Sequence, residues 1–160
     1  MGRRSHPKTG FSLVELLVVV AIMGVLACIG LPLAELSRQR TKEEDLRRSL
    51  REIRNAIDAY KQLVDLGAVP RAADGSGYPP SLDVLADGVR DARSPQGAKI
   101  YLLRRLPRDP FADGDLAAAE TWRLRSYASP PDDPKPGKDV FDVHSTSEGV
   151  ALDGSAYKTW

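Results

Sequence analysis

The sequence predicts an α+β fold in which a long N-terminal helix packs on a small antiparallel β-sheet, with a loop-rich segment between them. Three patterns lead to this prediction: an uncharged apolar run near the N-terminus, an amphipathic stripe that follows it, and two short strand-like segments near the C-terminus. A chain of 160 residues is long enough for one domain of this kind with an extension.

The composition argues against several classes of function. Twenty-three basic and 22 acidic residues leave a net charge of +1, so the overall charge gives no indication of nucleic-acid binding. The single cysteine, Cys28, cannot form an intramolecular disulfide. With only His6 and His144 as histidines, no His/Cys metal cluster can be assembled, and no nucleotide-binding or hydrolase motif is present. We therefore predict a protein that is not an enzyme.

The apolar run from residue 11 to residue 33 contains one charge, Glu15, and residues 16–32 contain none. A helix of this length can cross a hydrocarbon core of roughly 30 Å. A cleavable signal peptide would need a small-x-small site after the run, and Ala34-Glu35-Leu36 is not such a site. We therefore predict that residues 11–33 form a transmembrane helix.

Beyond the apolar run, the chain shows the period of an amphipathic helix. Apolar residues recur at spacings of four and three: Leu46, Leu50, Ile53, Ile57, Tyr60 and Val64. Gly67 and Pro70 end the pattern. We predict one helix from about Phe11 to Asp65, whose part from residue 34 is the spine of a globular domain spanning residues 34–160.

The rest of the chain is rich in turns. Nine of the twelve prolines lie between Pro79 and Pro136, which predicts loops, and the aspartates among them (Asp109, Asp113, Asp115, Asp132 and Asp133) are interpreted as turn residues. We expect Ser81 to cap a short helix over residues 81–89. Strands are predicted over 121–128 and 139–144, with a turn at Asp153-Gly154 before a last short strand that ends at Trp160.

The start of the apolar run carries a distinctive motif. A short basic leader, residues 1–10, ends in Gly10, which is followed by Phe11 and, four residues later, by Glu15; Pro32 lies near the end of the run. In these features the chain resembles the type IV pilin and pseudopilin superfamily. The resemblance implies cleavage between Gly10 and Phe11 by a prepilin peptidase and methylation of the new amine of Phe11. It also implies an N-terminus in the cytoplasm and a C-terminal domain in the periplasm.

Glu15 has a physical role in this interpretation. A glutamate within a bilayer costs on the order of 3 kcal/mol, so it needs a partner to persist. The resemblance implies that Glu15 of one subunit pairs with the N-terminal amine of its neighbour and sets the register of a helical filament, with Pro32 bending the helix. The competing interpretation is an interfacial Glu15 that reaches toward water.

The C-terminal part resembles the major, or G-type, pseudopilin of type II secretion. Leu106-Pro107-Arg108-Asp109-Pro110-Phe111, then Asp142-Val143-His144-Ser145 and a final Trp160 follow the order typical of that family. The resemblance implies a structural subunit of a pseudopilus that polymerises from the bacterial inner membrane. Its partners would be other copies of itself, other pseudopilins, the inner-membrane assembly platform and the prepilin peptidase.

One departure from that family concerns calcium. Its members usually carry a loop rich in Gly and Asp that binds calcium, whereas residues 146–154 here are shorter and poorer in acids. Calcium needs six to eight oxygen ligands. The candidates that could supply some of them are Asp142, Ser145, Glu148 and Asp153, with Asp139 beside them. We predict no tight site and interpret these residues as turn and surface acids, with weak calcium binding as the alternative.

A second function remains open beside the polymerising subunit. The chain could be an anchored binding module, such as a minor pilin-like protein of a type IV pilus or a DNA-uptake system. A groove or a basic cluster on the globular domain would favour this alternative, and Arg104, Arg105 and Arg108 form the only such cluster in the sequence.

Overall fold

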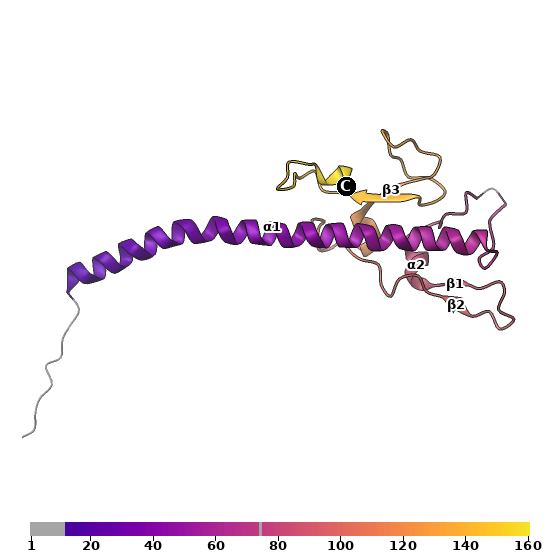
Figure 1. Cartoon of the computed structure of the whole chain (residues 1–160), viewed down its shortest axis with the longest axis horizontal. Coiled ribbons are helices and arrows are strands. Elements are labelled where there is room, and N and C mark those ends of the chain that lie inside the picture. The colour runs from indigo at the N-terminus through magenta and orange to yellow at the C-terminus, as the bar shows by residue number, and fades with distance from the viewer. Residues whose placement is uncertain (1–11, 74) are drawn as a thin grey trace, which may run out of the picture. The chain divides into compact units, whose positions relative to one another are not determined.

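The computed structural model describes residues 12–73 and 75–160, without the side chains of residues 28–32. The chain divides into two compact units, one up to Gln39 and one from Arg40 to Trp160. The element order is α1 (Leu13–Asp65), α2 (Asp83–Asp87), β1 (Val89–Arg90), β2 (Lys99–Ile100), the 3₁₀ turn η1 (Ala118–Thr121), β3 (Trp122–Arg125), β4 (Asp142–Ser145) and the 3₁₀ turn η2 (Tyr157–Thr159) (Figure 1). The α+β prediction is confirmed.

Helix α1 confirms the prediction of one helix that ends near Asp65. Its end is closed by two backbone hydrogen bonds, from Ala68 N to Leu63 O (2.8 Å) and from Gly67 N to Val64 O (3.0 Å). Gly67 has a φ of 71°, the left-handed conformation that this type of cap requires. The predicted stop signal at Gly67 is therefore correct, and its physical basis is backbone geometry.

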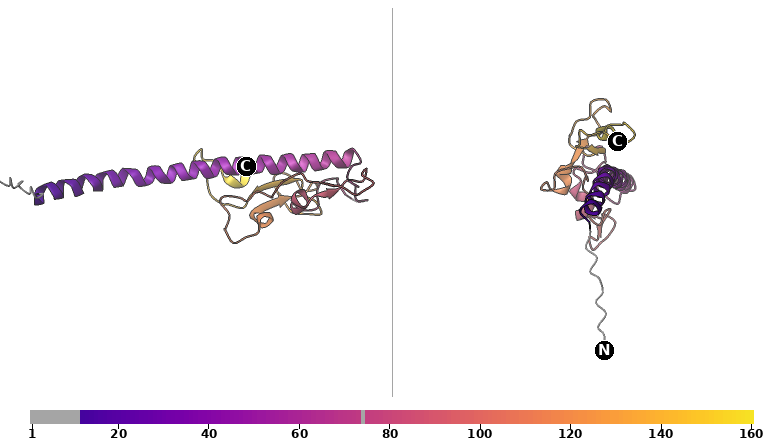
Figure 2. Two further views of the ribbon diagram at one scale, coloured as in Figure 1. Left: turned by 90° about the horizontal axis from the view of Figure 1, so that it is seen from below. Right: turned by 90° about the vertical axis from the view of Figure 1, so that its left-hand side faces the viewer.

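The apolar stripe of α1 forms the centre of the core in the unit from Arg40 to Trp160. All six stripe residues are buried, and Leu46 and Ile53 are fully inaccessible. Residues from the later elements complete the cluster: Leu82, Leu85, Val89, Leu103, Trp122, Val140, Val143, Ala151 and Tyr157. Within this unit the later elements lie along α1, as Figure 1 and the left view of Figure 2 both show.

The β-structure is smaller and more divided than predicted. Strands β3 and β4 pair antiparallel, with Trp122 opposite Ser145 and Leu124 opposite Val143. A second antiparallel pair, β1 and β2, has two residues in each strand and was not predicted. Strands of that length show no alternation that a sequence pattern could reveal.

Four predicted elements have other bounds in the structure. The strand predicted over 121–128 is β3, which ends at Arg125 because a turn follows at Tyr127 and Ala128. Helix α2 begins at Asp83, and its N-cap is the buried Leu82 without a side-chain bond, so Ser81 is not the cap. Strand β4 begins at Asp142, because Asp139 accepts a hydrogen bond from Tyr127 N (2.8 Å) and thereby closes the preceding loop. At the C-terminus η2 and a single bridge between Val150 and Ala156 replace the predicted last strand, although the Asp153-Gly154 turn is present.

Candidate functional site

The described part of the chain begins at Ser12, directly before α1, and Glu15 is the motif residue that it includes at this end of the helix. The hydroxyl of Ser12 accepts a hydrogen bond from Val14 N (3.2 Å), and its carbonyl accepts one from Leu16 N (3.1 Å), so Ser12 caps the helix. Glu15 lies in the first turn, where the positive end of the helix dipole favours a carboxylate. Gly10 and Phe11 lie outside the described residues, so the predicted cleavage site stays a prediction.

The first unit presents apolar side chains to its surroundings. Every large apolar side chain from Leu13 to Leu26 is exposed, with fractions between 48% at Val18 and 81% at Leu13. An exposed apolar surface of this extent is typical of a segment that contacts a partner or lipid. Among the described residues, no helix has a stretch both long and apolar enough to cross a membrane.

Part of the predicted span falls outside what the structure describes. Residue 11 and the side chains of residues 28–32 are not described. Pro32 lies in α1, and its side chain is among those outside the description. The predicted span and the assembly role of Pro32 therefore stay predictions.

In the second unit, two charged residues of α1 hold the C-terminal tail. Arg54 donates hydrogen bonds to Asp142 Oδ1 (2.8 Å), to Val143 O (3.0 Å) and to Trp160 O (2.8 Å). Glu43, which is 8% exposed, accepts one from Leu152 N (2.9 Å) and one from the Tyr157 hydroxyl (2.9 Å). The tail from β4 to Trp160 is thus bound to the helix by buried and half-buried polar contacts.

The four calcium candidates do not converge. Asp142 is paired with Arg54 and with Arg125 (3.5 Å), and its Oδ2 lies 3.5 Å from His144 Nε2. Glu148 is paired with Arg123 (3.3 Å) and Lys158 (3.1 Å), and the hydrogen bond from Lys158 lowers the pKa of its carboxyl.

The other two candidates also have partners of their own. Asp153 is paired with Arg47 (3.0 Å), and the hydrogen bond from the Ser155 hydroxyl lowers the pKa of the Asp153 carboxyl. Ser145 donates its hydroxyl proton to Asp109 Oδ2 (2.5 Å). Over the described residues, no group of three or more His, Cys, Asp or Glu side chains is arranged to hold a metal ion.

Asp109 is a polar core residue that the sequence interpretation missed. It is 3% exposed, and its carboxylate accepts hydrogen bonds from the Ser145 hydroxyl and from Phe111 N (2.8 Å). Its backbone N–H donates to the Thr121 hydroxyl oxygen (3.1 Å). The interpretation of Asp109 as a turn residue is confirmed, because its carbonyl accepts a hydrogen bond from Ala112 N (3.2 Å), but the burial of its side chain was not predicted. The two segments that carried the family resemblance, around Asp109 and around Ser145, meet through this buried pair.

The basic cluster of the sequence lies on a groove of mixed charge. Arg104, Arg105 and Arg108 line a cavity of about 660 Å³ together with Asp45, Arg48 and Glu52. Arg108 donates to the carbonyl oxygens of Asp113 (2.8 Å), Gly114 (3.0 Å) and Leu116. The carboxylates of Asp45 and Glu52 thus offset part of the positive charge that a nucleic-acid site would need, and the guanidinium of Arg108 is already engaged within the chain.

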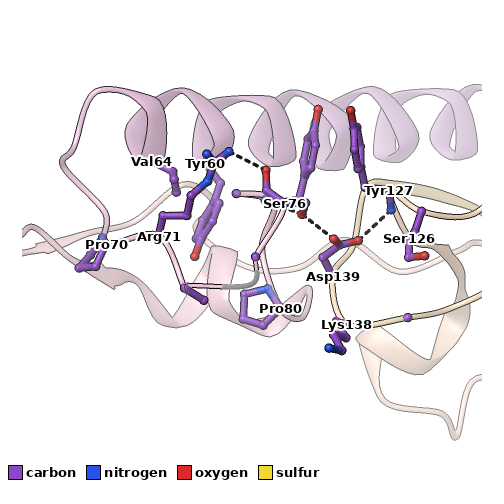
Figure 3. Close-up of a pocket in the computed structure, with 16 residues that line it drawn as sticks. Tyr60, Val64, Pro70, Arg71, Ser76, Pro80, Ser126, Tyr127, Lys138 and Asp139 are labelled. Carbon is purple, nitrogen blue, oxygen red and sulfur yellow. Dashed lines mark hydrogen bonds between the residues drawn. The ribbon is translucent and has the colours of Figure 1, made fainter.

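A larger pocket lies near the C-terminal end of α1 (Figure 3). Its volume is about 690 Å³, and we call it the tyrosine pocket after Tyr60, Tyr78 and Tyr127, which line it. Asp139 joins two of its walls, because it accepts hydrogen bonds from the Ser76 hydroxyl (2.5 Å) and from Tyr127 N (2.8 Å), as Figure 3 shows. Burial raises the pKa of the Tyr60 and Tyr78 phenols.

Comparison with known proteins agrees with the sequence interpretation. Residues 6–29 match the prokaryotic N-terminal methylation motif. The chain is similar to the type II secretion system core protein G of Klebsiella michiganensis, at 28% identity over 68% of this chain and 71% of that protein. It is also similar to the proteins of the same name from Aeromonas hydrophila (27% identity, 66% of this chain and 69% of that protein) and Vibrio cholerae (26%, 69% and 70%). No solved structure matches the chain significantly.

Proposed function

We propose that this chain is a type IV pilin-like major pseudopilin, a structural subunit of the pseudopilus of a type II secretion system. The observation that carries this proposal is a methylation motif over residues 6–29 that coincides with the first part of α1, where every large apolar side chain from Leu13 to Leu26 is exposed. A lone soluble chain does not leave such a helix surface uncovered. Lipid before assembly and the helices of neighbouring subunits after it are the two environments that would cover it.

Membrane attachment follows from the same segment. We propose a single-pass anchor in the bacterial inner membrane formed by residues 11–33, with the leader in the cytoplasm and residues 34–160 in the periplasm. The methylation motif supports processing between Gly10 and Phe11 by a prepilin peptidase. The finer partners, which are other pseudopilins and the inner-membrane assembly platform, are part of this proposal.

The role requires no catalysis. The candidates for chemistry in the globular unit are engaged in structural contacts, such as Asp109 with Ser145 and Asp142 with Arg54. Filament formation instead requires complementary surfaces that repeat from subunit to subunit. We therefore propose that the chain acts by polymerising.

The substitution Glu15→Ala tests the proposal. It removes one partner of the proposed buried pair with the neighbour's N-terminal amine, and breaking such a pair on one side costs about 3–5 kcal/mol. The span becomes more apolar, so insertion should not suffer. We expect normal insertion, a normal mature mass starting at Phe11, and a loss of cross-linked multimers and of secretion.

The matched control removes one carboxylate as well, but from a position outside the apolar segment. Glu44→Ala alters an exposed carboxylate in the globular unit and should leave assembly intact. Multimers and secretion at the parental level in Glu15→Ala would contradict the register role and would favour the anchored binding module.

A further inference from the structure

The tyrosine pocket has a chemical character that the proposed function does not use. Aromatic and proline side chains form its apolar walls: Tyr60, Tyr78, Tyr127, Pro70 and Pro80. The rings of Tyr78 and Tyr127 stack with centroids 5.6 Å apart, and Tyr127 is 61% exposed. Pockets of roughly 300–1,000 Å³ with such walls and a few polar groups are the usual size for ligand recognition.

Two cationic side chains, Arg71 and Lys138, line the pocket. Both carboxylate oxygens of Asp139 already accept hydrogen bonds, from Ser76 and from Tyr127 N. Arg71 donates to Ser76 O (2.9 Å), and within the described part of the chain neither Arg71 nor Lys138 is in an ion pair with a carboxylate. A ligand would therefore meet aromatic faces beside two positive charges and one hydrogen-bonded carboxylate, so the three charged side chains together favour an anionic ligand.

Aromatic grooves of this kind recognise proline side chains. Proline fixes its own backbone angle φ, so little conformational entropy is lost on binding, and its ring packs on aromatic faces. The cations add a preference for a segment that carries a carboxylate.

The chain itself presents adjacent prolines on its surface, at a turn that includes Pro131 and Asp132. We call residues 129–136, Ser-Pro-Pro-Asp-Asp-Pro-Lys-Pro, the proline loop. Pro130, Pro131 and Asp132 are exposed. Asp133 pairs with Lys135 inside the loop (2.6 Å), which leaves Asp132 as the carboxylate beside the two adjacent prolines.

Internal hydrogen bonds fix the shape of the proline loop. The Ser129 hydroxyl donates to Asp133 O (2.9 Å) and accepts from Lys135 N (2.8 Å), so the loop has a defined shape. None of the described residues that line the tyrosine pocket belongs to the proline loop. The residues that flank the loop, Ala128 and Gly137, do line the pocket. The loop of one chain thus does not fill the pocket of the same chain.

From these observations we infer that the tyrosine pocket of one subunit binds the proline loop of a second copy of this chain. Pro130 and Pro131 pack on the tyrosine rings, and Asp132 lies between Arg71 and Lys138. The pocket and the proline loop are neighbouring but distinct surfaces of the subunit, so a contact between the pocket of one copy and the loop of the next is heterologous and can repeat along a filament. The inference rests on the proposed function, since the polymer supplies the second copy.

Disulfide trapping tests the contact in the full chain. With Cys28→Ser as the background, one tagged chain carries Ala72→Cys in the pocket wall and a second, differently tagged chain carries Pro131→Cys in the loop. We expect a disulfide between the two tagged chains in the membranes of cells that assemble the filament. The matched control replaces Pro131→Cys by Gln96→Cys, an exposed position outside the pocket, and should give none.

Exchanging the charges of the pocket and the loop distinguishes a specific pairing of Asp132 with the two cations from a disulfide that forms only because the two chains are close together. Arg71→Glu with Lys138→Glu should abolish the disulfide, and Asp132→Lys in the loop partner should restore it. These side chains are exposed or half-exposed, so the melting temperature of each variant should stay that of the parent. Loss without restoration would contradict the assigned pairing.

The outcome distinguishes the two proposals. Cross-linked multimers that depend on Glu15 but form without the disulfide between positions 72 and 131 would overturn the contact and leave the filament intact. The disulfide in chains that form no multimers dependent on Glu15 would support the contact and contradict the filament.

Discussion

At the scale of single residues, Arg54 is the side chain on which the attachment of the C-terminal tail depends. It lies on α1 directly after the stripe residue Ile53. It is half-buried and donates to a carboxylate and to two carbonyl oxygens of the tail. A side chain that donates hydrogen bonds to three acceptors contributes more to the free energy of unfolding than an exposed ion pair does.

The prediction for Arg54 concerns stability. Arg54→Met keeps the apolar stem but leaves Asp142 without one of its donors, so the free energy of unfolding should fall by about 1–3 kcal/mol. Arg51→Met, at an exposed position one turn away, should change it by less than about 0.5 kcal/mol. Urea denaturation followed by circular dichroism measures both, and equal effects would show that the contacts of Arg54 add nothing.

A second prediction at this scale is the alkaline pH dependence of stability. Burial raises the pKa of the Tyr60 phenol above its ordinary value of 10.0. The unfolded chain ionises near pH 10, so the stabilisation by neutral Tyr60 is fully present below that pH. It is lost as the pH rises toward the higher pKa of the folded state.

The matched variants are Tyr60→Phe and Tyr101→Phe, the second at a side chain that is 63% exposed. Tyr60→Phe should flatten the decline of the unfolding free energy above about pH 10, and Tyr101→Phe should leave that decline unchanged. Denaturation at a series of alkaline pH values measures the slope. The same slope in Tyr60→Phe and in the parent would contradict the role of Tyr60.

At the scale of elements, α1 is defined by its two ends as much as by its stripe. Ser12 supplies the oxygen atoms that begin the helix, and Gly67 supplies the left-handed residue that ends it. The reversal at Gly67 turns the chain back toward the core, so that Ala68 and Val69 are buried. The helix end therefore positions the segment that leads to the tyrosine pocket.

Gly67→Ala tests the end of the helix. A Cβ at this position would meet no atom within 4 Å, so the cost is backbone strain alone. We expect a loss of about 1–2 kcal/mol in unfolding free energy, the usual penalty for a left-handed non-glycine residue. Gly114→Ala is the control, because it also meets nothing within 4 Å but has no positive φ. It should be neutral or slightly stabilising, and equal losses in thermal denaturation would refute the strain argument.

At the scale of the whole molecule, the globular unit is stabilised without a disulfide by its core and by polar contacts to the tail. The acids that could hold calcium are among these contacts: Asp142 with Arg54, Glu148 with Lys158, and Asp153 with Arg47. Binding of calcium would require these ion pairs to open. The sequence prediction of no tight calcium site thus gains a physical reason and stays a prediction.

Calcium titration of the purified chain checks it. A ligand that binds only the folded state raises the melting temperature by mass action. We expect calcium in millimolar excess to leave the melting temperature unchanged, with magnesium as the matched control ion. A rise with calcium that a chelator reverses would show that Asp142, Glu148 or Asp153 coordinates the ion.

The sequence by itself determined the extent of α1, its buried stripe and the position of the strand pair. These features depend on periodicity and on stop signals within a few residues, as the spacing from Leu46 to Val64 and the glycine at 67 illustrate. The motif at residues 10–15 was equally local, and its match to the methylation motif depends on no tertiary contact.

Only the tertiary structure decided which polar residues are buried together. Asp109 and Ser145 are 36 positions apart, and Arg54 and Trp160 are 106 apart, so no local pattern distinguishes them from surface charges. The tyrosine pocket likewise combines residues from α1 with two distant loops, and it exists because Asp139 joins those loops. Such sites depend on how the chain folds back on its own helix, and the energetics of a buried polar group depend on the partner that folding supplies.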